Sequence, residues 1–298
     1  MSETAGPIAD LSYRGYDGPR RVSIGRWWPI AKNGLRVTLR KKGFWVLVVL
    51  AYLPYVLLMM QLFVFSRMPE GAGIRFEEML AQSYSSWYWV LFVALIVGAG
   101  SIAADNRSNA LQIYLAKPIT KGDYLFGKWL SIFIIVYAVV FIPVFGTVLY
   151  AALSEGMIEF MREHGWLLPK AFLIAAVPAT VHASLLVGIS AWNRLPWLAG
   201  TIYAAVFFFW NGFTTIFGSV LQDRLSDGMS ATVQHLSLQG VITGLGTNLI
   251  GVAQRSMFRP ETQPLPDWRV LLVLGFAACA IGLFLARTHI RAVEVVKG

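Results

Sequence analysis

Six stretches of about 20 largely apolar residues constrain this chain more than any other feature of its sequence. A helix of that length crosses the hydrocarbon core of a bilayer, and backbone polar groups cannot stay unpaired there, so each stretch is expected to be a transmembrane helix. A transmembrane β-barrel would instead show alternating segments of about 10 residues, and the sequence has none. The predicted spans cover residues 44–66, 87–104, 124–153, 168–192, 196–221 and 268–286. The expected fold class is therefore an all-α membrane protein.

The composition agrees with this class. Of the 298 residues, 56% are hydrophobic and 14% are charged, which is too apolar for a chain whose whole surface faces water. The first 43 residues are polar and basic, without the apolar stretch and small-residue cleavage site of a signal peptide, so we expect them to be retained. Cys279, the only cysteine, excludes an internal disulfide framework and a multi-cysteine metal site.

Lys and Arg residues predict the orientation, because cytoplasmic segments carry an excess of them. Most of the 25 lie before the first span, in the connections after the second and fourth spans, or after the sixth span. We therefore expect both termini in the cytoplasm and the chain in the inner (cytoplasmic) membrane of a cell. The predicted parts are a cytoplasmic segment 1–43, a transmembrane domain 44–286 and a cytoplasmic tail 287–298. The net charge of +9 then reflects topology, and nucleic-acid binding loses its main support.

Residues 23–43, SIGRWWPIAKNGLRVTLRKKG, mix aromatic and aliphatic residues with Lys and Arg just before the first span. This pattern is typical of an amphipathic helix that lies in the cytoplasmic membrane interface. Its characteristic residues are Trp27, Trp28, Arg36 and Arg40. The alternative is a plain positively charged anchor that contacts no other protein.

The long outer segment 222–267 contains SLQGVITGLGTNLIGVAQRSMF, which has helical spacing of apolar residues but is interrupted by glycines. We expect a re-entrant or surface-lying helix there instead of a seventh span, and it is a candidate outer gate.

Residues 122–129, GDYLFGKW, share the glycine and lysine spacing of a phosphate-binding loop. No apolar strand precedes Gly122, and Trp129 stands where a Mg²⁺-binding Ser or Thr is required, so we reject a nucleotide site. No metal-ligand spacing and no catalytic set of residues is legible. We therefore expect no metal site, no catalytic residue and no cofactor on this chain.

Polar residues inside the spans are candidates for a substrate path, because they are costly in a membrane and often functional. These candidates are His182 in the fourth span and Asn211, Thr214 and Thr215 in the fifth. The alternative is that they tie neighbouring helices together through hydrogen bonds.

The connection between the second and third spans is the most distinctive segment. Asp105 and Asn106 are expected to close the second span, a short helix is predicted over about 110–116, and Pro118 ends it. Gly122 and Asp123 are expected to turn the chain into the third span. A short helix held between two spans is a good lever, since force on it passes to both. The alternative is an ordinary amphipathic connector.

The same segment resembles the signature of ABC transporter permeases of the type-two family, LxxPxxxxxYLxGK preceded by a small residue with Leu. The matching residues are Ala110, Leu111, Leu115, Pro118, Tyr124, Leu125, Gly127 and Lys128. The glycine usual just before this motif is replaced by Ser108 or Asn109, and the usual acidic cluster is reduced to Asp105.

This resemblance implies a permease that works as an exporter and carries no nucleotide site of its own. Two separate ATPase subunits would bind ATP and Mg²⁺, and a second permease chain would complete a homodimer or heterodimer. Residues 106–123 would be the coupling helix that docks on the ATPase, with the interface helix as a second contact. The implied docking residues are Asp105, Asn106, Arg107, Leu111, Tyr114, Leu115, Lys117, Pro118, Lys121 and Asp123.

Two rival functions remain. A membrane component with the same fold, acting in assembly or sensing, would have the same spans without transporting anything. A membrane-embedded enzyme would need several catalytic groups at one depth, and the spans hold too few ionisable residues to assemble them.

Overall fold

The computed structural model describes residues 25–65, 76–84, 88–115, 119–221, 224–252 and 264–290, and within these ranges it is helical without strands. Six helical segments are long and apolar enough to cross a membrane, which confirms the predicted all-α class with six spans. They are α2 (Lys42–Phe65), α4 (Tyr88–Gly98) continued by α5 (Ala103–Arg107), α7 (Lys121–Glu155), α9 (Leu167–Trp192), α10 (Pro196–Leu221) and α13 (Trp268–His289). The chain is thus a membrane protein.

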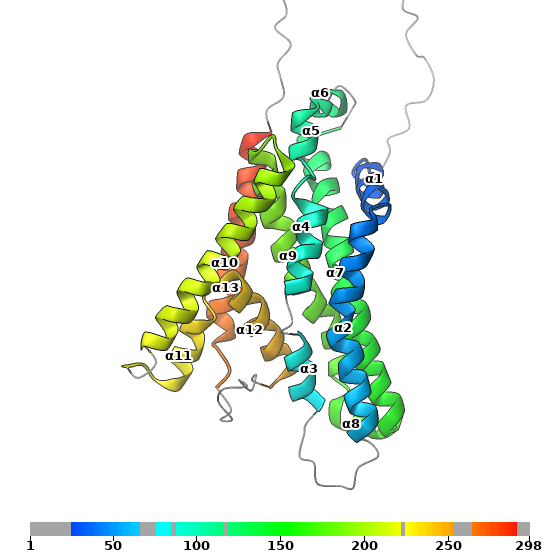
Figure 1. Cartoon of the computed structure of the whole chain (residues 1–298), viewed down its shortest axis with the longest axis vertical. Helices are drawn as coiled ribbons and strands as arrows, with labels where there is room; N and C mark the ends of the chain where they lie inside the picture. Colours follow the sequence, from blue (N-terminus) through cyan, green and yellow to red (C-terminus); the bar gives the residue numbers. More distant parts are fainter. Residues whose placement is uncertain are drawn as a thin grey trace, which may run out of the picture.

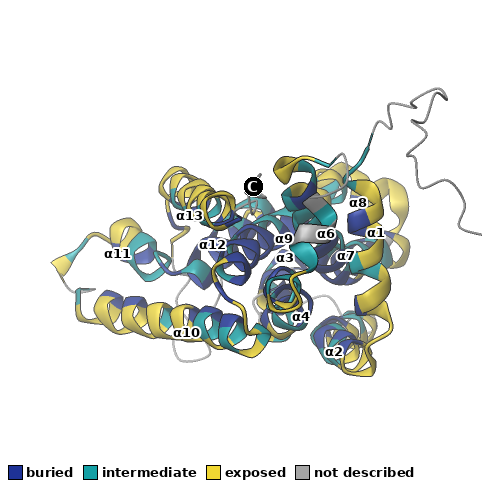
Figure 2. Ribbon diagram, turned by 90° about the horizontal axis from the view of Figure 1, so that it is seen from above, coloured by how far each residue is buried: buried dark blue, intermediate teal, exposed yellow. Residues whose placement is uncertain are grey.

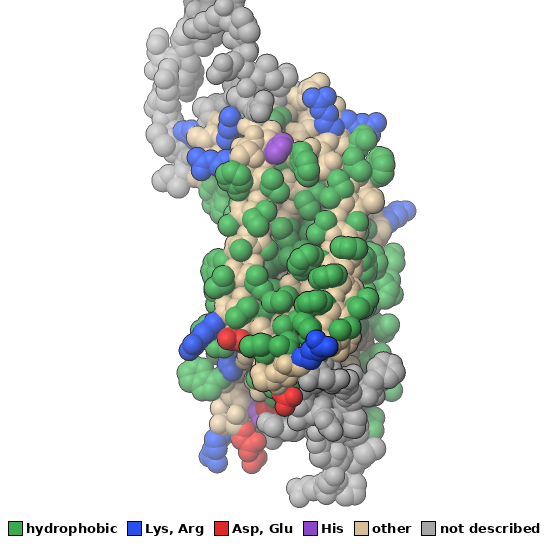
Figure 3. All heavy atoms as spheres, turned by 90° about the vertical axis from the view of Figure 1, so that its left-hand side faces the viewer, with side chains coloured by type: hydrophobic (Ala, Val, Ile, Leu, Met, Phe, Trp, Pro, Cys, Tyr) green, Lys and Arg blue, Asp and Glu red, His purple; other side chains and the backbone are tan. Residues whose placement is uncertain are grey.

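Shorter helices gather at the two ends of this bundle (Figure 1). At one end lie α1 (Trp28–Leu39), α5 and α6 (Ala110–Leu115), beside the end of α13. At the other end lie α3 (Phe76–Tyr84), α8 (Met157–His164) and α11 (Asp227–Gln234). Figure 3 shows hydrophobic side chains between two ends that carry the charged ones, on the left-hand side of Figure 1.

Helix α9 lies at the centre of the bundle and packs against α7 and α13, whereas α10 and α13 leave one face exposed (Figure 2). Small residues allow this close packing. A Cβ atom on Gly188 of α9 would overlap the backbone of Gly282 in α13, and one on Gly282 would overlap the Ser184 carbonyl. The two helices therefore touch backbone to backbone.

The start of α7 differs from the prediction, which used Gly122 and Asp123 as a turn and began the span at residue 124. In the structure, α7 begins at Lys121, and Thr120 caps it. The Asp123 amide donates to the Thr120 hydroxyl (3.1 Å), and the Thr120 amide donates to the Asp123 carboxylate (3.1 Å). This capping box satisfies backbone donors at the start of the helix, a position that the apolar run alone does not predict.

The segment that was predicted to lie on the outer side forms α12 (Leu238–Ile250), which packs among α3, α9, α10 and α13. Most of its residues are buried, including Gly240, Gly244 and Gly246. A Cβ atom on Gly246 would overlap the ring of Tyr84 in α3. The glycines that weakened the sequence prediction are therefore what lets this helix enter the bundle.

Candidate functional site

The connection from α4 through α5 to α6 is fastened to the end of α9 by hydrogen bonds. The Ser190 hydroxyl accepts from the backbone amides of Ile102 (3.0 Å) and Ala103 (2.9 Å) and donates to the Ala99 carbonyl (2.9 Å). The side-chain amide of Asn106 donates to the backbone carbonyls of Ala191 (3.0 Å) and Asn193 (3.1 Å). These bonds satisfy backbone groups where the second span is interrupted, and they fix α5 on α9.

Asp105 fastens the same connection to α7. The Lys128 ammonium lies 2.7 Å from the Asp105 carboxylate, and the Tyr124 hydroxyl donates to the same oxygen at 2.7 Å. The Lys128 and Asp105 side chains are only 12% and 18% exposed, so water screens this pair weakly. Helix α5 is therefore held between α7 and α9.

Tyr114 brings α6 into this cluster. Its ring centroid lies 5.4 Å from that of Tyr124, and the Lys128 ammonium lies 6.0 Å and 5.6 Å from the two ring centroids. Such cation–π contacts are attractive at this range. Partial burial and the Asp105 carboxylate raise the pKa of the Tyr114 hydroxyl, which therefore stays neutral. We call Asp105, Tyr114, Tyr124 and Lys128 the Asp105 cluster.

The exposed tip of the connection consists of Arg107, Ser108 and Asn109. Asn109 has a φ of 54°, in the left-handed region, where it links α5 to α6. Asn tolerates this conformation better than most residues other than Gly. Asn109, one of the two residues that stand where the signature usually has a glycine, thus adopts a conformation that glycine adopts readily.

The structure brings together several of the predicted docking residues. Asp105, Asn106 and Tyr114 are joined to the bundle as described, and Leu111 is half-buried against the main core. Lys121 is exposed in the first turn of α7, beside the capping residue Asp123. Lys117, Pro118 and the side chain of Leu115 lie outside the described residues.

Tyr124 and Lys128 matched the signature but were not predicted as docking residues, and Ser190 was not predicted at all. In the structure the Lys128 ammonium pairs with Asp105. The signature itself contained the signal, since its Tyr and Lys stand four residues apart and share one face of a helix.

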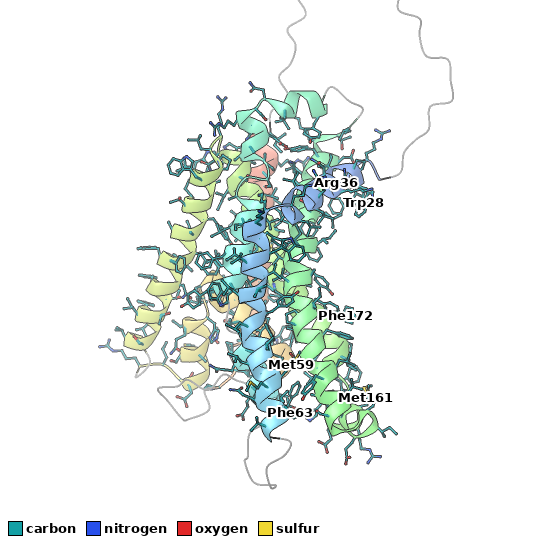
Figure 4. All side chains as sticks on the ribbon, turned by 45° about the vertical axis from the view of Figure 1, so that its right-hand side comes forward. Trp28, Arg36, Met59, Phe63, Met161 and Phe172 are labelled. Carbon is teal, nitrogen blue, oxygen red and sulfur yellow. The ribbon has the colours of Figure 1, made fainter. Side chains whose placement is uncertain are left out.

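Helix α1 packs across the start of α7 at the same end of the bundle (Figure 4). The rings of Trp27 and Phe126 meet edge to face at 5.2 Å, and a Cβ atom on Gly127 would lie 2.7 Å from the Trp27 carbonyl. Trp28, Arg36 and Arg40 are exposed. The predicted interface residues thus divide into one that anchors α1 and three that face outward.

Of the four path candidates, His182 lies on α9 and the other three lie together on α10. His182 is buried and shares a 2.6 Å hydrogen bond with the Tyr203 hydroxyl of α10. The Asn211 side chain accepts from the Ser237 hydroxyl (2.9 Å), while the Thr214 and Thr215 hydroxyls donate to carbonyls of their own helix. Each has a structural partner, and their role in a path stays a prediction.

A separate apolar groove of about 870 Å³ lies between α9, α12 and α13, and none of the four path candidates lines it. Three of its polar lining side chains form hydrogen bonds. The Trp129 indole donates to the Ser184 hydroxyl (3.0 Å), and the Asn248 amide donates to the carbonyls of Gly244 (2.8 Å) and Pro266 (3.0 Å). The groove presents a hydrocarbon surface.

Trp129 also belongs to a ladder of rings along α7. Successive ring centroids are 4.9 to 5.9 Å apart, within the range of favourable aromatic pairs. The rings are those of Phe126, Trp129, Phe133, Tyr137, Phe141 and Phe145.

The family model described as "ABC-2 family transporter protein" matches residues 28–287. No curated protein matches the chain. Among the residues that the structure describes, no group of His, Cys, Asp and Glu has the arrangement of a metal site.

Proposed function

The chain belongs to the ABC-2 family of transporter proteins and is a transmembrane component of an ABC transporter, and from this premise we propose that it is the permease of an exporter driven by a separate ATPase subunit. The working unit would contain two permease chains and two ATPase subunits in the inner membrane of a cell. ATP and Mg²⁺ would bind to the ATPase subunits.

One observation carries the proposal: the α5–α6 connection ends in an exposed tip and is fastened to two spans. Arg107, Ser108 and Asn109 form the tip, while Asp105 and Asn106 join its base to α7 and α9. A load on the tip would therefore move both spans instead of bending a loose loop. A coupling helix requires this arrangement.

The residues of GDYLFGKW support a mechanical role instead of nucleotide binding. Lys128 is paired with Asp105, and Gly127 makes room for α1, so neither is available to cradle a phosphate. When ATP closes the ATPase pair, the two coupling helices would be drawn together, and α7 and α9 would follow.

The opposite end of the bundle would then open to release the substrate. Helix α12 is the candidate outer gate, because it enters the bundle without crossing it and borders both α9 and α13. The apolar groove beside it is open to a hydrocarbon substrate. The predicted contribution of His182, Asn211, Thr214 and Thr215 to the path belongs to this proposal.

The test reverses one charge at the tip. Arg107→Asp changes an exposed residue without disturbing the core, and we expect it to reduce the ATPase rate of the reconstituted permease–ATPase complex by about tenfold or more, because a reversed charge at an interface costs several kcal/mol. Arg224→Asp is the matched control, since Arg224 is also exposed and lies at the other end of the bundle. An unchanged rate with Arg107→Asp, or an equal loss with both variants, would contradict docking at this tip.

A further inference from the structure

A small cavity lies inside the bundle where α2, α3, α9 and α12 meet. Four polar side chains line it: Tyr55 of α2, Tyr84 of α3, His182 of α9 and Gln239 of α12. No Asp, Glu, Lys or Arg is among its described lining residues, so its polar groups are hydrogen-bonding groups without fixed charge. This neutral lining suits an uncharged ligand with hydrogen-bond donors and acceptors.

Gln239 has an unsatisfied side chain in this cavity. The residue is 4% exposed, and neither its amide nitrogen nor its amide oxygen has a hydrogen-bond partner among the described residues. A primary amide offers two donors and an acceptor, and burying all of them unpaired is strongly disfavoured. A partner for this amide is therefore required inside the cavity.

The size of the cavity restricts what that partner can be. The space open to the centre of a water molecule is about 20 Å³. One water needs about 10 to 15 Å³ on this measure and two to four polar partners. A sugar, a lipid headgroup or a metal with its ligand shell exceeds the room available.

We infer that this cavity binds an ordered water, which pairs with the Gln239 amide and joins α12 to the neighbouring polar side chains. The role of this water rests on the proposed function, in which α12 is the outer gate. The bound water would then hold α12 in its position among the neighbouring helices.

The residues around the cavity show why α12 needs a further hydrogen-bond partner at this point. Pro178 has no amide hydrogen, so the Ile174 carbonyl of α9 lacks its usual helical donor. The Tyr84 hydroxyl lies 3.4 Å from that carbonyl and 3.4 Å from the Ile242 carbonyl of α12, at the long limit for hydrogen bonds. The direct hydrogen bonds of the Tyr84 hydroxyl to α9 and α12 are therefore long, and a bridging water would add shorter ones.

The test compares amide hydrogen exchange of α12 in lipid nanodiscs for the full-length wild type and Gln239→Leu. If water is bound, the variant removes its main partner, and the α12 amides exchange faster by about fivefold or more. If the amide is dry, Leu relieves an unsatisfied polar group, and exchange is unchanged or slower. The sign of the change thus supports or overturns the inference.

Two further variants keep the test specific. Gln61→Leu makes the same chemical change at an exposed position of α2, and it should leave α12 exchange unchanged. Tyr55→Phe removes one lining hydroxyl, and its effect should be non-additive with Gln239→Leu because both act on one water. Strict additivity would overturn the shared water. Exchange is measured without ATP turnover, so a failure here is distinguishable from a failure of ATPase coupling.

Discussion

Asp105→Asn is expected to lower the ATPase rate of the reconstituted permease–ATPase complex by about tenfold or more. The variant keeps the shape of the side chain but leaves the Lys128 ammonium, which is 12% exposed, without its counter-charge. Removing one partner of a fully buried pair costs about 3 to 5 kcal/mol, and this partly buried pair is expected to cost less, though enough for a tenfold effect. The Asp105 cluster is the joint between α5 and α7, so its loss disconnects the tip from the third span. ATPase rates per assembled complex check this result.

Two variants distinguish a loss of the connection between α5 and α7 from a general destabilisation of the protein. The exchanged pair Asp105→Lys with Lys128→Asp restores opposite charges and should recover part of the rate. Asp227→Asn removes an exposed carboxylate at the far end of the bundle and should change nothing. A full rate with Asp105→Asn, in complexes that assemble normally, would show that the ion pair plays no part in coupling.

Gly282→Ala is expected to destabilise the bundle by about 3 kcal/mol, at the upper end of the range for an overpacked core. The added methyl group would collide with the backbone of α9 at Ser184, and a backbone cannot move aside as a side chain can. Thermal unfolding in detergent, followed by circular dichroism, measures the change.

Gly212→Ala is the matched control for this substitution. Gly212 also lies inside a span, α10, but an added Cβ atom there meets open space. Ala is a better helix former than Gly by about 1 kcal/mol, so this variant should be as stable as the wild type or slightly more stable. Equal stability of the two variants would contradict the backbone contact between α9 and α13.

The six spans were predictable because length and apolarity are local properties of the sequence. The predicted start of α7 differed from the observed one for a local reason too. An apolar run marks where a helix enters lipid, whereas Thr120 and Asp123 mark where the helix itself begins. Such capping residues are polar, so a hydropathy pattern does not detect them.

The contacts of the candidate site could be predicted only in part. Asp105, Asn106 and Tyr114 were predicted as docking residues, and Tyr124 and Lys128 matched the signature. Which of these residues pair with one another, and that Ser190 holds the backbone of α5, depends on how three spans pack together. The burial of α12 was equally hidden, since its glycines read as helix breakers until Tyr84 is placed against Gly246. Long-range packing, which one sequence does not encode in any local pattern, decides these contacts.

Site-specific cross-linking between the tip and the ATPase subunit tests the central claim most directly. The background variant Cys279→Ser removes the only cysteine, and Arg107→Cys or Arg224→Cys then places a single thiol at one end of the bundle. A thiol-to-amine cross-linker is added to the complex in lipid vesicles. Docking at the tip predicts a permease–ATPase product with Arg107→Cys and none with Arg224→Cys. A product with Arg224→Cys, or none with Arg107→Cys in an assembled complex, would contradict it.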